Sequence, residues 1–390
     1  MRAARLLRET RLFDFIRNLW TRDAKAKGNS FFFDCPLILL QSDDWGRVGV
    51  RDKEGYDLLR ASGVRLGENP YDFYTLETAE DVMAVRDVLQ RHRDYTGRSA
   101  CLVMNFLMSN LNFPKIIAGD CKRVELLPLT EGLPGSWKRP GLFEAYRQGI
   151  ADGVFYPGLH GLTHFSTVAV EHALAKGGDR ADLLRTFWRA ETPYIYWRMP
   201  WIGYEYCNPE KPQSGFLSAE KQTKLIRQAA DTFKNLFSTP PVSACAPGYR
   251  DNHDTHLAWS KSGVRVAQNG SGSPLSPHMD DCEILNLHRT VDFEPTLKDL
   301  PVEKYLQLAE GCFARGVPAI VSVHAINFHS SLKDSRTPTL QTLDLFLTAL
   351  ERKHPNLLYV HDADVYDIVT RGKLRTPYGQ IPVKATGREE

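Results

Sequence analysis

The stretch Leu37–Gly46, which runs LILLQSDDWG, decides how the rest of the chain is interpreted. An apolar run leads to the adjacent acids Asp43 and Asp44, and Trp45–Gly46 then indicates a turn. This pattern predicts a buried strand that presents two carboxylates at its C-terminal end. Adjacent carboxylates repel each other unless a cation or a proton neutralises part of their charge. The alternative is that one aspartate caps the next turn while the other faces solvent.

The composition of the chain indicates a globular protein. The 390 residues are enough for one large α/β domain or two ordinary ones. Apolar residues make up 42% of the sequence and charged residues 25%, which are globular values. The formal net charge of +2 gives no bulk attraction to nucleic acid or to an acidic polymer. No window approaches the apolar length that a membrane span requires.

The cysteines and the N-terminal sequence indicate the cellular compartment in which we expect the protein. The seven cysteines are odd in number, scattered, and form no CxxC pair, so we expect buried free thiols in a reducing compartment. Residues 1–27 contain several arginines and no signal-peptide pattern, so we expect a cytoplasmic protein. Apolar residues at helical spacing predict an amphipathic helix over Arg11–Trp20. We expect this helix to pack on the body of the protein, and a helix lying on a membrane surface is the alternative.

The order of predicted elements favours one barrel-like domain. About eight predicted strands alternate with helices, which is typical of βαβ units and a parallel sheet. No repeat or linker-like composition is present, and residues 109–139 form a long insertion. We therefore divide the chain into a basic helix and linker (1–30), an α/β domain (31–373) and a polar tail (374–390) that we expect to be frayed.

Several residues with catalytic chemistry fall at predicted strand ends. Asp43–Asp44, His160, Pro247–Arg250 and His324 all follow strands, and barrel chemistry collects at the C-terminal ends of strands. His160 and His164 are spaced i, i+4, so both imidazoles can share one metal ion. The alternative is that one histidine is bonded into the fold and the other is exposed. One carboxylate with two imidazoles would leave a coordination position for water.

These motifs, in this order, resemble the polysaccharide deacetylase superfamily, the NodB-homology group that includes carbohydrate esterase family 4. SDDWG is similar to its first motif, HGLTH to its second, and IVSVHAINF at Ile320–Phe328 to its fifth, a strand that ends in histidine. The resemblance extends over residues 36–370 and implies a distorted (β/α) barrel with long loop insertions.

The resemblance also implies roles for individual residues. Asp44, His160 and His164 would bind a divalent metal ion, most often Zn²⁺, with Co²⁺ and Ni²⁺ as alternatives. Asp43 would be the general base that takes a proton from water. His324 would be the general acid that protonates the departing amine.

The third family motif is the loop around Pro247. The resemblance implies that the backbone N–H of Tyr249 faces the oxyanion, with Arg250 and Trp45 in the substrate-binding part of the site. The family has an arginine two residues before the proline, whereas this chain has Cys245. We expect Arg250 to replace that arginine from the other side of the loop.

Two further motif positions remain open. The amino-acid pattern of Arg198–Trp201 matches the third motif better than the loop around Pro247 does. This stretch follows no clear predicted strand, so we treat it as the second candidate for the motif. The Asp-Trp pair of the fourth motif is not visible around Arg265–Gly270, so the partner of His324 is not identified. Outside these motifs, we interpret His253 and His256 as surface residues of a helix.

The sequence therefore predicts a metal-dependent hydrolase that removes an acetyl or other acyl group from an amino sugar or glycan. Its expected partner is a carbohydrate substrate, without nucleic acid, and membrane contact would come only through the N-terminal helix. The alternatives are metal-independent hydrolysis of a non-sugar amide and a non-catalytic carbohydrate-binding protein. The aromatic stretch 194–206 is either a sugar-stacking subsite or ordinary packing of an insertion.

Overall fold

The computed structural model describes residues 29–208, 215–272, 274–298 and 300–389. The amphipathic helix predicted at Arg11–Trp20 lies outside these residues. Among the helices that are described, none has the length and apolar character needed to cross a membrane.

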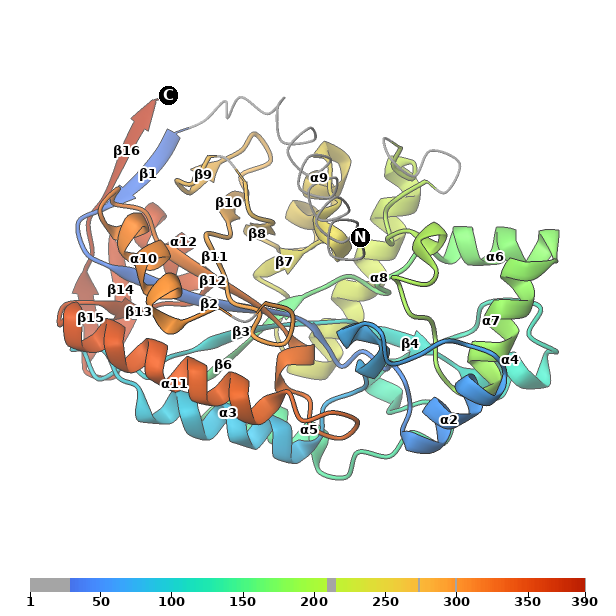
Figure 1. The fold of residues 1–390 in the computed structure, drawn as a ribbon. Helices are drawn as coiled ribbons and strands as arrows, with labels where there is room; N and C mark the ends of the chain where they lie inside the picture. The colour runs from blue at the N-terminus through green and yellow to red at the C-terminus, as the bar shows by residue number, and fades with distance from the viewer. Residues whose placement is uncertain (1–28, 209–214, 273, 299, 390) are drawn as a thin grey trace, which may run out of the picture.

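Eight parallel strands form the centre of the fold, in the order β11-β12-β2-β3-β6-β7-β8-β10 (Figure 1). The strand β2 that was predicted from LILLQSDDWG lies between β12 and β3, and all nine of its residues are buried. The bounds of the eight are β2 (Leu37–Trp45), β3 (Leu102–Phe106), β6 (Phe155–Leu159), β7 (Ser243–Cys245), β8 (Val266–Asn269), β10 (Leu285–His288), β11 (Val291–Asp292) and β12 (Ala319–His324).

The remaining strands extend this sheet or form small separate ones. Beyond β10 the sheet continues with β9 (His278–Met279), β1 (Asn29–Phe33) and β16 (Ala385–Glu389), and these neighbours pair antiparallel. The strand β13 (Leu358–Tyr359) pairs with β2. Two hairpins stand apart, namely β4 (Ser109–Leu111) with β5 (Leu126–Pro128) and β14 (Lys373–Thr376) with β15 (Gly379–Pro382).

The expectation that residues 374–390 are frayed is wrong for the described part of that segment. β14 and β15 pair with each other, and β16 pairs with β1 along five register positions, so that the two strands lie side by side in Figure 1. Because the segment is polar, its sequence gives no burial signal. Its backbone is ordered by hydrogen bonds to distant strands instead.

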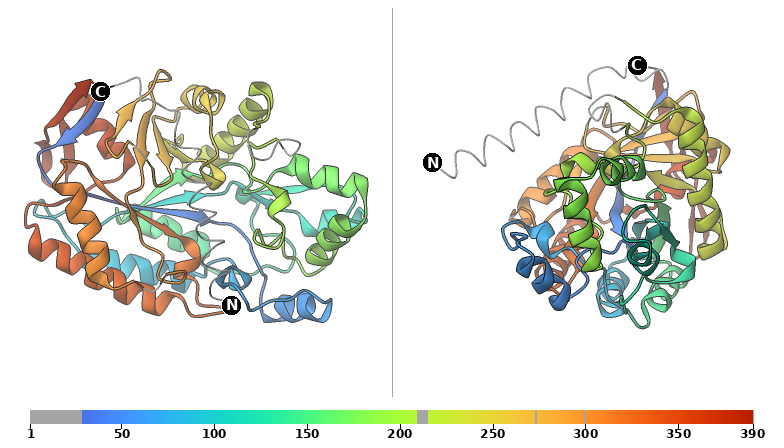
Figure 2. Two further views of the ribbon diagram at one scale, coloured as in Figure 1. Left: turned by 45° about the horizontal axis from the view of Figure 1, so that its top comes forward. Right: turned by 90° about the vertical axis from the view of Figure 1, so that its right-hand side faces the viewer.

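Helices pack around the strands, as the right-hand view of Figure 2 shows. In Figure 1, α3 and α11 lie side by side beneath the sheet, and α8 packs against α9. The α-helices are α2 (Lys53–Ala61), α3 (Ala79–Arg91), α4 (Phe113–Ala118), α5 (Leu142–Ala151), α6 (Thr167–Lys176), α7 (Asp179–Arg189), α8 (Ala219–Phe237), α9 (His253–Lys261), α10 (Val302–Phe313), α11 (Arg336–Lys353) and α12 (Asp362–Arg371). Short 3₁₀ turns are η1 (Pro70–Phe73), η2 (Leu129–Glu131), η3 (Pro200–Ile202), η4 (Pro247–Tyr249) and η5 (Ala325–Phe328).

The parallel strands curl into a nearly closed barrel, whose seam is crossed by Arg289 and Thr290. β10 and β11 lie at opposite ends of the parallel order, yet only these two residues separate them in sequence. The N–H of Arg289 donates to the Asn269 carbonyl on β8 (3.1 Å), and the N–H of Thr290 donates to the Ile320 carbonyl on β12 (3.0 Å). The two edges therefore meet within a two-residue crossing, which confirms the predicted distorted (β/α) barrel.

A bulge at the end of β2 directs the side chains of both aspartates into the same cavity. In a regular strand, Asp43 and Asp44 would point to opposite faces. Here the pairing of β2 with β3 shifts register between Ser42 and Trp45, and Asp44 has a φ of 74°, in the left-handed region that aspartate tolerates better than most residues. Both carboxylates consequently line the same cavity.

The interpretation of His256 as a surface residue is wrong, although His253 is exposed as expected. The His256 ring is buried, and its nitrogens contact Asp280 (2.6 Å) and Asp251 (3.2 Å). Burial alone would lower the pKa of His256, but the hydrogen bonds to these two acids raise it to about 10. Folding therefore stabilises the charged imidazolium, because the ring is buried with its charge compensated.

We expect this ion pair to make stability depend on pH. The contribution of His256 should be complete below the unfolded pKa of about 6.5 and should be lost as the pH rises through about 10. His256→Gln should cost about 2 kcal/mol of unfolding free energy at pH 6. The difference in melting temperature between the variant and the unmodified chain should shrink toward pH 10. An equal difference at both pH values would contradict this account, and the exposed His172→Gln is the matched control.

Candidate active site

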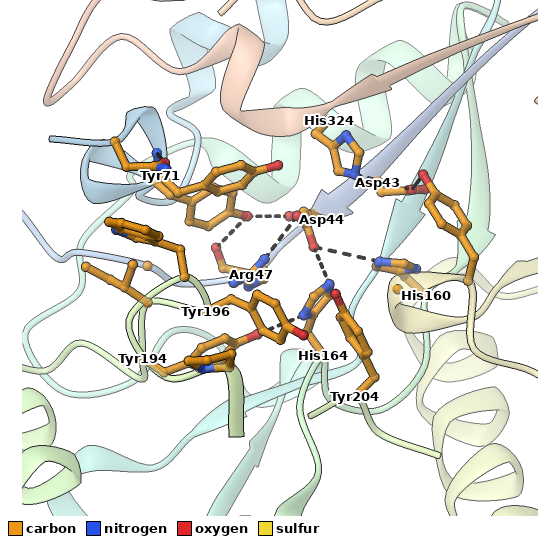
Figure 3. Close-up of a pocket in the computed structure, with 18 residues that line it drawn as sticks. Asp43, Asp44, Arg47, Tyr71, His160, His164, Tyr194, Tyr196, Tyr204 and His324 are labelled. Atoms are coloured by element: carbon orange, nitrogen blue, oxygen red, sulfur yellow. Dashed lines mark hydrogen bonds and ion pairs between the residues drawn. The ribbon is translucent and has the colours of Figure 1, made fainter. Parts of the chain in front are cut away.

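A cavity of about 590 Å³ lies at the C-terminal ends of the barrel strands (Figure 3). Six of the residues predicted from the sequence line it, from four different segments of the chain. They are Asp43, Asp44, His160, His164, Tyr249 and His324.

Asp44, His160 and His164 form a compact cluster of ligand atoms. The Nε2 atoms of His160 and His164 lie 3.7 Å and 3.4 Å from Oδ1 of Asp44. Ligands placed about 2.0–2.1 Å from a tetrahedral zinc ion are separated by roughly 3.4 Å. The cluster therefore has the size of one face of a zinc coordination sphere.

The two histidines are held so that Nε2 can act as the ligand atom. Nδ1 of His160 lies 2.8 Å from the Cys245 carbonyl, and because a carbonyl only accepts, Nδ1 carries the hydrogen and Nε2 keeps its lone pair. Nδ1 of His164 lies 2.8 Å from the Tyr194 hydroxyl. Burial, together with the nearby Arg47 cation, holds the pKa of His164 well below its usual value, so this imidazole is neutral.

The two oxygens of the Asp44 carboxylate have different surroundings. Its Oδ2 forms a salt bridge of 3.0 Å with Arg47, whereas its buried Oδ1 has no hydrogen-bond partner among the residues that the structure describes. Burial alone would raise the pKa of Asp44, but Arg47 and the histidines outweigh it and keep the group ionised. A buried, charged oxygen without a partner is costly unless a cation compensates it. Asp44, His160 and His164 could thus hold a divalent metal ion.

Asp43 is ionised and fixed by a bidentate ion pair with Arg289. The two terminal nitrogens of the guanidinium donate to Oδ1 (2.7 Å) and Oδ2 (2.6 Å), and Asn105 donates a further bond of 2.8 Å to Oδ1. Burial would raise the pKa of Asp43, yet Arg289 outweighs it and holds the pKa well below its usual range. This carboxylate is therefore available as a hydrogen-bond acceptor at any ordinary pH.

Arg289 is the arginine that pairs with Asp43, and the expectation that Arg250 does so is wrong. Arg250 is not among the residues that line the cavity, whereas Arg289 is 1% exposed and reaches Asp43 from the barrel seam. The sulfur of Cys245 lies beside the pair, 3.8 Å from Asp43 and 3.9 Å from Arg289. The only signal in the sequence was an arginine directly after the strand Leu285–His288.

His324 has a partner that the sequence did not reveal. Oε1 of Glu294 lies 2.5 Å from Nδ1 of His324 and also accepts from its backbone N–H (3.1 Å), while Asn327 donates to Oε2 (2.6 Å). Burial would lower the pKa of His324, but Glu294 raises it to about 9. The ring is therefore protonated at neutral pH, with Nε2 3.9 Å from Asp43 in the cavity.

Two expectations for the oxyanion and substrate-binding part are wrong. The backbone N–H of Tyr249 donates to the Ala246 carbonyl (2.8 Å), so it is already used within the turn η4. The Tyr249 hydroxyl instead lies 3.2 Å from Asp43. Trp45 is completely buried and stacks on Phe328 rather than lining the cavity, because the bulge turns the aspartates toward the cavity and leaves the indole in the core.

Aromatic side chains form most of the remaining cavity wall. Within the stretch 194–206, Tyr194, Tyr196, Trp197 and Tyr204 line the cavity, whereas Tyr206 is buried in the core. Trp197 is 47% exposed at this wall. On the other side are Tyr71, Tyr74 and the Arg47 guanidinium, which lies over the rings of Tyr74 (4.6 Å) and Tyr194 (5.0 Å).

A buried glutamate shapes the turn between the two histidines. Glu205 accepts hydrogen bonds from the backbone N–H groups of Leu162 (3.1 Å) and Thr163 (2.9 Å). Gly161 has a φ of 83°, and a Cβ there would lie 2.2 Å from the Glu205 carboxylate. Glycine is therefore required at this position, and the glutamate fixes the backbone that presents His160 and His164.

Comparisons with known proteins give matches in structure only. No family model and no curated protein matches this chain. A protein assigned as a polysaccharide deacetylase from Mycobacterium smegmatis matches with 11% identity, 86% of this chain and 90% of that chain covered, and a TM-score of 0.44. A family 4 carbohydrate esterase from Streptomyces lividans matches with 9% identity, coverages of 83% and 91%, and a TM-score of 0.36.

A family 4 pseudoenzyme from Bacillus anthracis also matches, with 10% identity, coverages of 86% and 66%, and a TM-score of 0.38. These matched proteins are a polysaccharide deacetylase and two members of carbohydrate esterase family 4. At these identities and TM-scores they assign no activity to this chain.

The ligand cluster leads to a direct prediction about metal binding. His160→Ala/His164→Ala should lose one zinc equivalent per chain, with the affinity of that site falling more than about 100-fold, since even outer-sphere partners of ligands are worth 10–100-fold. The exposed His172→Ala is the control. Elemental analysis after dialysis, followed by zinc titration, measures both quantities. An unchanged stoichiometry in the double variant would exclude these histidines as ligands.

Proposed function

We propose that this protein is a metal-dependent hydrolase that removes an acetyl or other acyl group from an amino sugar or glycan. One observation supports this most strongly. The Asp44–His160–His164 cluster shares a cavity with the ionised Asp43 and the protonated His324. Hydrolysis of an amide needs a polarised carbonyl, an oriented water, and a proton for the leaving nitrogen.

Each group of this chain has a defined part in such a reaction. A divalent ion held by Asp44, His160 and His164 would polarise the acyl carbonyl and make water more acidic. Asp43 accepts a hydrogen bond from the attacking water and orients it, and its low pKa means that it keeps an accepted proton only briefly. His324 donates the proton that the departing amine requires.

The aromatic walls of the cavity suit the binding of a sugar ring. The faces of Tyr and Trp side chains offer apolar contact, and their hydroxyl and indole groups offer hydrogen bonds. The Asp43, Asp44, His160 and His164 side chains are 13% exposed or less, so bulk water is largely kept from the reacting groups. We therefore infer a carbohydrate carrying an acylated amine as the substrate class.

The test is acetate release from N-acetylated amino-sugar oligosaccharides by the zinc-loaded protein. Asp43→Asn should lower kcat by at least about 100-fold, because general-base catalysis contributes 10²–10⁴-fold. Asp231→Asn on the exposed face of α8 is the matched control. Absence of acetate from such oligosaccharides, together with turnover of cyclic ureides or other amides, would replace this proposal with a non-sugar amidohydrolase. Glycan binding without any turnover would leave a binding protein.

The Glu294–His324 contact predicts the alkaline side of the pH profile. Because His324 must be protonated to act as an acid, activity should fall as the pH rises through about 9. Glu294→Gln removes the charge that raises this pKa, so the fall should move toward the ordinary histidine value of about 6.5. The kcat profile from pH 5 to pH 10 measures the shift, with the exposed Glu303→Gln as control. Profiles that coincide would show that His324 is not the acid.

A further inference from the structure

A second group of metal-ligating side chains lies outside the cavity. His253, the first residue of α9, meets Asp281 and Cys282 in the turn between β9 and β10. Nδ1 of His253 lies 3.5 Å from Oδ1 of Asp281 and 3.7 Å from Sγ of Cys282. The three ligand atoms all lie within 4.8 Å of one another.

These separations match the edges of a tetrahedral zinc site. With Zn–N and Zn–O distances of about 2.0–2.1 Å and a Zn–S distance of about 2.3 Å, adjacent nitrogen and oxygen ligands are roughly 3.4 Å apart, and nitrogen and sulfur ligands roughly 3.6 Å. An imidazole, a carboxylate and a thiolate form a borderline-soft donor set, which favours zinc over magnesium or calcium. A carboxylate alone would not give this selectivity.

The turn that carries two of the ligands is held in place by a neighbouring acid. Oδ1 of Asp280 accepts from the backbone N–H groups of Cys282 (2.9 Å) and Ile284 (2.9 Å). Its Oδ2 contacts Nδ1 of His256 on α9 at 2.6 Å. The turn is thereby fastened to the helix that supplies His253, so the three ligands are positioned by contacts that leave their ligand atoms unused.

Access to this group is open from solvent. The side chains of His253 and Asp281 are 62% and 78% exposed, whereas Cys282 is 7% exposed and is the buried member of the group. An ion would therefore gain three protein ligands and retain a fourth position for water, without any rearrangement of the core.

We propose that His253, Asp281 and Cys282 form a second divalent-metal site, selective for zinc and other thiolate-binding ions. On binding, the Cys282 thiol loses its proton to solvent and a sulfur–metal bond forms, with no change in oxidation state. The ion fastens α9 to the β9–β10 turn. Since η4, with Tyr249, leads into α9, the site secures the helix that follows the loop beside Asp43.

The test uses Co²⁺ as the probe, because a cobalt–thiolate bond gives a near-ultraviolet charge-transfer band. Titration into the full chain bearing His160→Ala/His164→Ala, which removes the cavity ligands, should produce this band with one equivalent of cobalt, and Zn²⁺ should displace it. Cys282→Ser should abolish the band. Cys35→Ser and Cys245→Ser should leave it unchanged, because neither thiol belongs to this group of ligands.

A second variant keeps the test decisive if Cys282→Ser does not fold. His253 is exposed, so His253→Ala should fold normally and bind cobalt at least about tenfold more weakly. Absence of the thiolate band, or a band and affinity that survive both substitutions, would overturn the proposal. Because the cavity ligands are removed in this experiment, its result is independent of whether the protein hydrolyses amides.

Discussion

The buried ion pair between Asp43 and Arg289 is the interaction on which the barrel interior and the site both depend. Side chains that are 1–2% exposed carry these opposite charges, and removing them from water is costly unless nearly every donor and acceptor is paired. The arrangement meets that condition. The guanidinium also donates to Gln41 (3.2 Å), Ser322 (3.0 Å) and Gln268 (3.2 Å), which lie on three different strands.

The same pair links strands across the interior of the barrel. Arg289 lies where the chain crosses from β10 to β11, and its contacts reach β2, β8 and β12 across the interior. Strands that are far apart in the sheet order are thereby tied to one guanidinium. Loss of either partner would leave an uncompensated charge in the core, so the carboxylate that serves the chemistry also supports the fold.

How much could be predicted from the sequence depended on whether a feature is local. The strand Leu37–Trp45, the acids that end it and the histidines of HGLTH were predicted because apolar runs and short spacings are visible along the chain. Arg289 and Glu294 were missed, since their contacts arise only once the sheet curls. Trp45 was misplaced because a bulge, which shifts side chains by one face, leaves no mark in an apolar pattern.

The exposed indole of Trp197 has a consequence for optical spectroscopy. Among the described tryptophans, Trp45, Trp188 and Trp259 are fully buried, Trp137 is 4% exposed and Trp201 is half-buried, whereas Trp197 stands at the cavity wall with its ring half open to water. A ligand that covers this ring would remove water from it and change its fluorescence, while the buried indoles would contribute an almost constant background. The cavity thus contains its own reporter of occupancy, which responds to binding whether or not a reaction follows.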